Sequence, residues 1–207
     1  MPVEKIVSNA KRSWGLWLIQ EDEDQLRNQL GELEPIPPAF TNPKKRLEFL
    51  AGRLLIRELL SSLKLDFAGI QKDEHGKPFL KNLPHHISLS HSYPYVAAIV
   101  DADKIVGIDL EQPKDKLFRV ASRIHASAEL ADLGDNLTKH CVYWCAKEAL
   151  IKVYGKKDLT LAENLQISPF ELKSEGNITG RIIVKDGTTT IPLMYKVFDG
   201  FVVAFNH

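Results

Sequence analysis

Two carboxylates, Asp109 and Glu111, lie two residues apart in a segment that is otherwise largely apolar. The apolar residues predict a strand over 104–110. On a strand, residues i and i+2 point to the same face, so the two carboxylates would lie side by side. Adjacent carboxylates repel each other unless a cation lies between them, and hard oxygen ligands suit Mg²⁺. The alternative is a strand that simply ends in solvent, since Pro113 follows shortly after.

A second group of charged residues lies in the predicted helix over 138–153. Glu148 and Lys152 are four residues apart, and Lys147 is adjacent to Glu148. One interpretation is an ordinary helical salt bridge that contributes about 0.2–0.5 kcal/mol. The other is a third carboxylate ligand of a metal ion, with the lysines contacting phosphates that the metal bridges.

Basic and hydroxyl side chains form a third group in the first half of the chain. Arg46 and Arg53 are seven residues apart on a predicted helix and therefore share one face. Lys77 lies in a Gly-Lys-Pro turn, and Ser90 and His91 lie in a Ser-His-Ser run. Each has an ordinary alternative, namely a surface charge, a turn lysine or a hydroxyl-rich hairpin.

Taken together, these groups suit a multiply phosphorylated ligand. Two or three carboxylates with several cations and hydroxyls match a metal-bound pyrophosphate with an additional phosphate. The sequence contains no Walker loop and no G-x-G-x-x-G fingerprint that would hold a nucleotide in the commoner ways.

The elements that must position these residues alternate between helices and short strands, which predicts an α+β fold. Asn42 and Pro43 predict the start of a helix over 44–63, and Gly155 predicts the end of the helix over 138–153. Four prolines predict a loop over 34–43. The other predicted helices cover 21–33, 117–124 and 127–133, and the other predicted strands cover 14–19, 67–73, 78–80, 86–89, 95–100, 165–168, 181–185, 188–195 and 201–205.

The two halves of the chain resemble each other. Phe49–Arg57 can be laid beside Trp144–Lys152, and the closing strands Tyr95–Val100 and Phe201–Phe205 also match. One interpretation is that any two amphipathic helices look alike, so the match needs no common origin. The other is a duplication into two pseudo-symmetric α/β halves, with domains over 1–103 and 104–207. Such a pair would place a ligand cleft between the halves.

Composition limits the classes of function. The chain has 207 residues, is 44% hydrophobic and carries 27 basic and 27 acidic residues, so its net charge is 27 − 27 = 0. A general nucleic-acid binder would need a basic surplus, so no nucleic-acid partner is expected. The two cysteines, Cys141 and Cys145, imply no disulfide framework and favour a cytoplasmic location. No apolar run is long enough to span a membrane or serve as a signal peptide.

At these residues the sequence resembles the 4′-phosphopantetheinyl transferase superfamily, in its surfactin-type (Sfp-like) branch. The family strand pattern (V/I)-G-(I/V)-D-x-E stands here as Val106–Glu111. The family helix pattern W-(S/C/T)-x-K-E-(S/A)-x-x-K stands as Trp144–Lys152. The upstream Gly-Arg step, Gly-Lys-Pro turn and Ser-His-Ser segment occur in the same order. Order and spacing agree from about Arg46 to Lys152, whereas the last fifty residues or so match only in strand content.

The resemblance implies a monomer of two pseudo-symmetric halves that binds coenzyme A between them. It implies transfer of the phosphopantetheine arm to a serine of an apo acyl or peptidyl carrier protein, with release of 3′,5′-ADP. By position it implies that Asp109, Glu111 and Glu148 bind Mg²⁺, that Lys147 and Lys152 contact the phosphates, and that Arg46, Arg53, Lys77, Ser90 and His91 hold the 3′-phosphoadenosine end.

The implied chemistry needs a base for the attacking serine hydroxyl. Glu148 is the expected catalytic base, directly or through a water, and metal-bound water is the alternative. Lys152 is expected to act beside it on the phosphates. Two other functions remain open from the residues alone. One is a Mg²⁺-dependent phosphohydrolase or nucleotidyl transferase on another nucleotide, and the other is a coenzyme A-binding module without catalysis.

Overall fold

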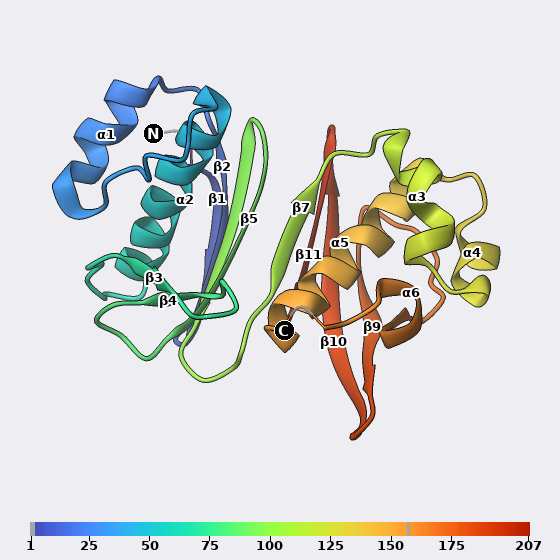
Figure 1. Ribbon diagram of the computed structural model, residues 1–207. Helices are drawn as coiled ribbons and strands as arrows, with labels where there is room; N and C mark the ends of the chain where they lie inside the picture. Colours follow the sequence, from blue (N-terminus) through green and yellow to red (C-terminus); the bar gives the residue numbers. More distant parts are fainter. Residues whose placement is uncertain (1–2, 157) are drawn as a thin grey trace. The chain divides into compact units, whose positions relative to one another are not determined.

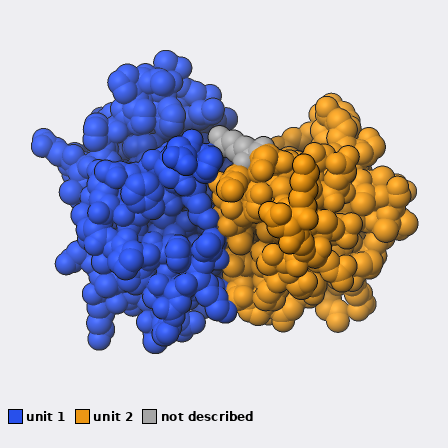
Figure 2. All heavy atoms as spheres, turned by 60° about the horizontal axis from the view of Figure 1, so that its bottom comes forward, with its two compact units in different colours: residues 1–106 blue, residues 107–207 orange. Residues whose placement is uncertain are grey.

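The protein divides into two compact units, which are described separately. A computed structural model describes residues 3–156 and 158–207. Unit 1 ends at Val106 and unit 2 begins at Gly107 (Figures 1 and 2). The sequence places the domain boundary slightly earlier, after residue 103.

Unit 1 consists of two helices that pack on an antiparallel sheet (Figure 1). The sheet has the strand order β1-β2-β6-β5-β4-β3. The strands are β1 (Val3–Ser8), β2 (Arg12–Leu18), β3 (Ile70–Lys72), β4 (Pro78–Leu80), β5 (His86–Ser92) and β6 (Tyr95–Asp101), and the helices are α1 (Glu23–Leu30), the short 3₁₀ helix η1 (Gly31–Leu33) and α2 (Pro43–Ser62).

Unit 2 packs its long helix α5 on a second antiparallel sheet, of order β7-β11-β10-β9-β8. The strands are β7 (Ile108–Glu111), β8 (Leu165–Ile167), β9 (Glu175–Val184), β10 (Gly187–Phe198) and β11 (Phe201–Asn206), and the helices are α3 (Lys116–Ile124), α4 (Ser127–Leu133), α5 (Leu137–Tyr154) and α6 (Leu161–Asn164).

The two sheets share one connectivity. In unit 1, β2 is followed by helices and then by β3 to β6, and the sheet order is β2-β6-β5-β4-β3 once the edge strand β1 is set aside. In unit 2, β7 is followed by helices and then by β8 to β11, and the order is β7-β11-β10-β9-β8. The first strand therefore pairs with the last strand in both. This match supports the duplication that the sequence suggests, and the α+β fold class is confirmed.

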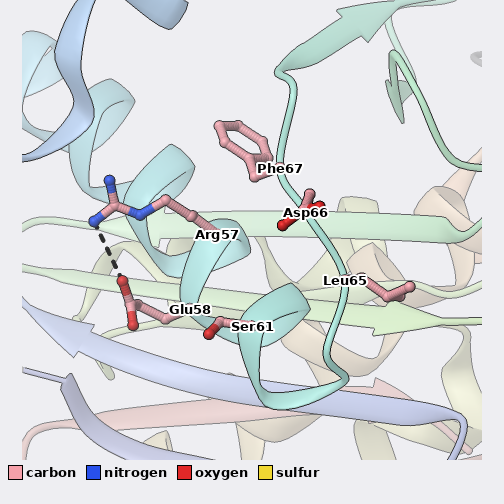
Figure 3. Close-up of a pocket in the computed structure, with 6 residues that line it drawn as sticks. All are labelled: Arg57, Glu58, Ser61, Leu65, Asp66 and Phe67. Atoms are coloured by element: carbon pink, nitrogen blue, oxygen red, sulfur yellow. Dashed lines mark hydrogen bonds and ion pairs between the residues drawn. The ribbon is translucent and has the colours of Figure 1, made fainter.

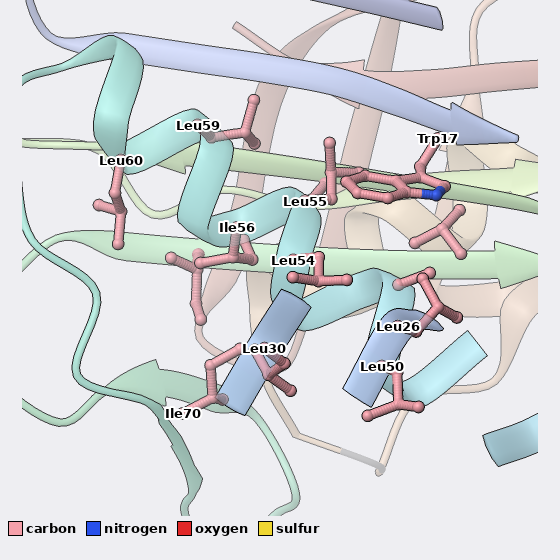
Figure 4. Packing of buried hydrophobic residues seen from close by; sticks show 14 of the residues in the cluster. Trp17, Leu26, Leu30, Leu50, Leu54, Leu55, Ile56, Leu59, Leu60 and Ile70 are labelled. Atoms are coloured by element: carbon pink, nitrogen blue, oxygen red, sulfur yellow. The ribbon is translucent and has the colours of Figure 1, made fainter. Parts of the chain in front are cut away.

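The core of unit 1 forms between α2 and its sheet (Figure 4). The side chain of Asn42 accepts a hydrogen bond from the backbone N–H of Lys44 and so caps α2, as predicted. Leucine and isoleucine side chains on the buried face of α2 pack with Trp17, which is fully buried on β2. Gly52 brings α2 close to β5, since a Cβ there would lie 3.1 Å from Leu89 Cδ2.

The core of unit 2 needs an even closer approach of helix and strand. A Cβ on Gly107, just before β7, would lie 2.1 Å from the carbonyl oxygen of Ala149 on α5. The backbone of Gly107 is also held by Asn206, whose Oδ1 accepts its N–H at 2.8 Å. The predicted cap of α5 is confirmed, because Gly155 adopts the left-handed conformation there.

Most predicted elements form within a few residues of their expected bounds. The strand predicted over 104–110 is shorter and begins at Ile108. The strand β1 was not predicted from the sequence, because Glu4 and Lys5 are followed by Ile6 and Val7, and this edge strand therefore lacks the polar–apolar alternation of a half-buried strand. The strand β9 begins at Glu175, well before the predicted residue 181.

Candidate active site

Asp109 and Glu111 lie on the face of β7 that α5 covers. Asp109 pairs with Ala204 and Glu111 with Val202 on the neighbouring strand β11. Both of those β11 residues belong to the apolar core beneath α5, and directly paired residues of antiparallel strands share a face. The predicted side-by-side arrangement of the two carboxylates is therefore present.

Asp109 meets the C-terminal half of α5. Its Oδ1 accepts a hydrogen bond from Lys152 Nζ at 2.8 Å, and the same ammonium donates to the carbonyl oxygen of Ile108 at 2.8 Å. The Asp109 side chain is only 9% exposed, whereas that of Lys152 is 27% exposed. Lys152 thus reaches from the rim of the site to a mostly buried carboxylate.

Glu148 lies one helical turn before Lys152, and its carboxyl group has a raised pKa. Burial, followed by repulsion from Asp109, raises the pKa of Glu148 to about 7, against the opposing effect of Lys152. A carboxyl group in this state holds and releases a proton near neutral pH, as a general base must. Asp109, Glu148 and Lys152 therefore form one electrostatically linked group.

Glu111 also faces the helix. Its Oε2 accepts from Lys116 Nζ at 2.6 Å, and its Oε1 accepts from the backbone N–H of Gln112 at 2.8 Å. Burial raises the pKa of the Cys145 thiol, and Cys141, Asp109 and Glu111 add to that shift. These interactions place both strand carboxylates toward the same stretch of α5.

The donor chemistry of this face suits a hard divalent cation. All three expected ligands are carboxylates, and the like charges of Asp109 and Glu148 would be compensated by a cation between them. In the described part of the chain, no three His, Cys, Asp or Glu residues are gathered closely enough to hold a metal ion. Lysine ammonium groups, from Lys152 and Lys116, contact two of the three carboxylates instead.

Lys147 occupies a different environment from the one expected of a phosphate ligand. Its side chain is fully buried, and Nζ donates to Glu129 Oε2 at 2.5 Å and to the carbonyl oxygens of Ile124 and Leu161 at 2.7 and 3.1 Å. Burial lowers its pKa, against the effect of Glu129. The three acceptors use all three ammonium protons, so this geometry gives Lys147 a structural role and does not support direct contact with phosphates.

The two arginines expected to bind the 3′-phosphoadenosine end are both held by carboxylates of unit 1. Arg46 Nε and Nη2 donate to the two oxygens of Glu23, each at 2.6 Å. Arg53 donates from Nε to Glu34 and lies over the Phe49 ring, with Cζ 3.4 Å from the ring centroid. Burial lowers the pKa of Arg53, against the effect of Glu34.

The other expected ligands of unit 1 lie on β5 and on the turn before β4. Ser90 is buried on β5, and the adjacent His91 has a side chain that is 56% exposed. The His91 Nδ1 lies 3.1 Å from Glu48 Oε2. Lys77 is half-buried, its backbone N–H donates to Asp73 Oδ1 at 2.8 Å, and burial lowers the pKa of its side chain.

Three carboxylates that contact these residues were not predicted from the sequence, of which Glu34 and Glu129 are buried and Glu48 is partly buried. Glu34 lies in the proline-rich loop and accepts from Arg53 and from the backbone N–H of Ile70. Glu48 accepts from the backbone N–H of Tyr93 and lies 3.1 Å from His91 Nδ1, and Glu129 accepts from Lys147. Only Glu129 carried a local signal, because it lies three positions after Ala126, the N-cap of α4, and accepts the N–H of Ala126 at 2.8 Å.

One cavity in unit 1, of about 300 Å³, lies at the C-terminal end of α2 (Figure 3). It is lined by Arg57, Glu58, Ser61, Leu65, Asp66 and Phe67. None of these lining residues belongs to the site expected from the sequence.

No described helix is both long and apolar enough to cross a membrane.

Comparison with known proteins gives the family. Residues 105–205 match the 4′-phosphopantetheinyl transferase superfamily, and residues 38–101 match the N-terminal domain of 4′-phosphopantetheinyl transferases. A 4′-phosphopantetheinyl transferase of Bacillus subtilis is 34% identical over 159 residues, which cover 72% of this chain and 67% of that protein. The chain belongs to the 4′-phosphopantetheinyl transferase superfamily. It is an enzyme of the transferase class.

Two further relatives place this chain within the superfamily. The 4′-phosphopantetheinyl transferase Sfp of Bacillus subtilis strain 168 is 34% identical over 116 residues, which cover 52% of this chain and 51% of that protein. The transferase AcpT of Escherichia coli K12 is 28% identical over 159 residues, which cover 68% of this chain and 80% of that protein. The resemblance to the Sfp-like branch is thereby confirmed.

Proposed function

We propose that this transferase moves the 4′-phosphopantetheine arm of coenzyme A to a serine of an apo acyl or peptidyl carrier protein, using Asp109, Glu148 and Lys152 of unit 2. Family membership supports the reaction, with coenzyme A as substrate and a carrier protein as acceptor. The observation that carries the assignment to these residues is the linked group on β7 and α5, where Lys152 binds Asp109, and burial together with Asp109 raises the pKa of Glu148.

In the proposed reaction, the serine Oγ forms a bond to the β-phosphorus of coenzyme A. The phosphorus–oxygen bond to the leaving group breaks, and 3′,5′-ADP departs with the electron pair. Glu148 accepts the proton of the serine hydroxyl, a role that suits a carboxyl group with a pKa of about 7. Lys152 contributes a positive charge beside Asp109, where it stabilises negative charge on the departing phosphate.

Asp109, Glu111 and Glu148 are the residues proposed to hold Mg²⁺. When bound, this ion would neutralise charge on the pyrophosphate. Asp109 and Glu111 would turn from their lysine partners toward the ion, since ammonium groups now contact both carboxylates.

Ligands for the adenosine end are proposed from unit 1. His91 is the strongest of them, because its side chain is more than half exposed and is anchored at one nitrogen. Lys77 directly precedes β4, and Ser90 lies on β5, which pairs with β4. Both are proposed as ligands together with His91. Arg46 and Arg53 would have to exchange their carboxylate partners Glu23 and Glu34 for a phosphate.

The test is to incubate the protein with an apo carrier protein, Mg²⁺ and coenzyme A and to weigh the carrier by mass spectrometry. The carrier should gain the mass of one phosphopantetheine group, about 340 Da, and chelation of the metal should stop the gain. Coenzyme A cleaved without any gain in carrier mass would support a phosphohydrolase instead. Binding of coenzyme A with neither outcome would support a binding module.

A further inference from the structure

One carboxylate of α2, Glu48, contacts both the expected ligand His91 and the turn that follows it. Glu48 Oε2 lies 3.1 Å from His91 Nδ1, and Glu48 Oε1 accepts a hydrogen bond from the backbone N–H of Tyr93 at 3.0 Å. The Glu48 side chain is 10% exposed, whereas the His91 side chain is 56% exposed. A buried acceptor therefore fixes one edge of a ring whose remaining surface is accessible.

The same stretch of α2 fixes the turn itself. Lys44, one helical turn before Glu48, places its Nζ 5.0 Å from the centroid of the Tyr93 ring. Tyr93 lies between β5 and β6, so contacts from Lys44 and Glu48 hold the turn that ends the His91 strand. Because a carboxylate can only accept, Nδ1 must be the protonated nitrogen of His91 when it bonds to Glu48.

We infer that Glu48 is a positioning residue for coenzyme A, since it orients the His91 ring so that Nε2 is directed at the 3′-phosphate. The inference rests on the proposed function, in which His91 binds the 3′-phosphoadenosine end. A ring that donates from Nδ1 to Glu48 and from Nε2 to a phosphate oxygen is an imidazolium, whose charge Glu48 balances on one side and the phosphate on the other. Glu48 would then serve the ligand without touching it.

The two oxygens of Glu48 allow its structural and positioning roles to be separated. In Glu48→Gln, the amide oxygen can still accept from the Tyr93 N–H, while the amide nitrogen facing His91 can only donate. The turn is thus kept, while Nδ1 loses its acceptor, so the ring can no longer be held as an imidazolium that donates from both nitrogens. Glu58→Gln is the matched control, because Glu58 lies on the same helix and lines the separate cavity of unit 1.

The experiment compares kcat and KM for coenzyme A and for 3′-dephospho-coenzyme A in the wild type, Glu48→Gln, His91→Ala, the double variant and Glu58→Gln. Glu48→Gln should raise KM for coenzyme A about three- to tenfold, in line with the loss of one oriented hydrogen bond. For 3′-dephospho-coenzyme A, both kcat and KM of Glu48→Gln should stay within about twofold of the wild-type values. In the His91→Ala background the same substitution should have no further effect on KM.

Three results would overturn the inference. Equal losses for both substrates would show that Glu48 is only structural, as would an effect that persists without His91. An unchanged KM for coenzyme A in His91→Ala would remove the ligand on which Glu48 is proposed to act, while transfer by that variant would leave the proposed function intact. Wild-type protein that transfers nothing would instead contradict the proposed function itself.

Discussion

The strands β2 of unit 1 and β7 of unit 2 occupy the same position in their sheets, but β2 presents apolar residues to its helix and β7 presents carboxylates. In unit 1, Gly15 and Trp17 on β2 pair with Ala98 and Val96 on the closing strand β6. In unit 2, Asp109 and Glu111 on β7 pair with Ala204 and Val202 on β11, the corresponding closing strand. Where unit 1 has a fully buried tryptophan and a glycine, unit 2 has two carboxylates.

The central helices differ in the same sense. Gly52 and Arg53 on α2 correspond to Lys147 and Glu148 on α5 when the two helices are laid over each other. Arg53 is compensated by Glu34, whereas Glu148 faces a second carboxylate, Asp109. Lys152 only partly compensates this pair of carboxylates, and a strongly shifted pKa beside a second carboxylate is typical of a functional site.

The largest expected effect comes from removing the strand carboxylate. We predict that Asp109→Ala lowers the transfer rate by about a thousandfold or more, since the site loses a proposed metal ligand and the partner of Lys152. The melting temperature should stay close to that of the wild type, because relief of repulsion with Glu148 offsets the lost ion pair. Activity and thermal unfolding are measured together, with Asp103→Ala, whose ion pair is exposed, as the control. Near-normal transfer at low Mg²⁺ would remove Asp109 from the site.

The next effect separates Lys147 from Glu148. Lys147→Met should destabilise unit 2 by about 3–5 kcal/mol, because it leaves Glu129 buried without its cation. Urea unfolding measures the loss, and the double variant with Glu129→Gln should recover part of it. Lys11→Met, at an exposed pair, is the control and should leave the urea midpoint close to that of the wild type. A stable Lys147→Met protein with weakened coenzyme A binding would return Lys147 to the phosphate ligands.

Alanine substitutions at Gly107 and Gly52 test how closely the central helix of each unit approaches its sheet. Gly107→Ala should cost about 3 kcal/mol, because the new Cβ would meet the backbone oxygen of Ala149, which cannot move independently of α5. Gly52→Ala should change stability by no more than about 1 kcal/mol, since the helix favours alanine and the neighbour is a leucine methyl that can shift. Equal costs in chemical denaturation would show that the two helices pack alike.

His125 should contribute an acid-dependent loss of stability in unit 2, while the raised pKa of Glu148 acts in the opposite direction over the same pH range. Burial, with the nearby charges of Lys147 and His140, lowers the pKa of His125 to about 3, so the folded state favours the neutral ring. The contribution is present above the unfolded pKa of about 6.5 and is lost as pH falls toward 3, which amounts to about 2 kcal/mol by pH 5. His125→Leu should remove this loss, so the variant should gain about 2 kcal/mol relative to the wild type as pH falls from 7 to 5. An unchanged slope would contradict the assignment to His125, which also lies near Glu129 and Tyr143.

The sequence predicts the fold well where the information is local. Caps and glycine positions locate α2 and α5, and alternation at Asp109 and Glu111 gives the face of β7. Spacing alone left an ordinary salt bridge between Glu148 and Lys152 open, and it was the resemblance to the family that implied a shared site with Asp109. In the structure Lys152 pairs with Asp109.

The remaining features depend on partners that are distant in the chain. Lys147 is adjacent to Glu148, yet a helix turns its side chain by about 100° to another face, where Glu129 is 18 residues away. Arg53 meets Glu34 across the proline-rich loop, and His91 meets Glu48 across 43 residues, since 91 − 48 = 43. Sequence spacing cannot show whether a cationic side chain pairs with a distant carboxylate of the protein or with a phosphate of a ligand, because both partners are anions.

The most direct test of the contrast between the units is the single-turnover transfer rate at saturating coenzyme A. Two single variants are compared. Glu148→Gln changes a charged residue on α5, and Arg57→Gln changes one on α2. Arg57 corresponds to Lys152 and donates to the carbonyl oxygen of Gln29. Glu148→Gln should slow transfer by about a hundredfold or more, as loss of a general base does, while Arg57→Gln should stay within a few-fold of the wild type. A Glu148→Gln enzyme as fast as the wild type, or an Arg57→Gln enzyme equally slowed, would contradict the account.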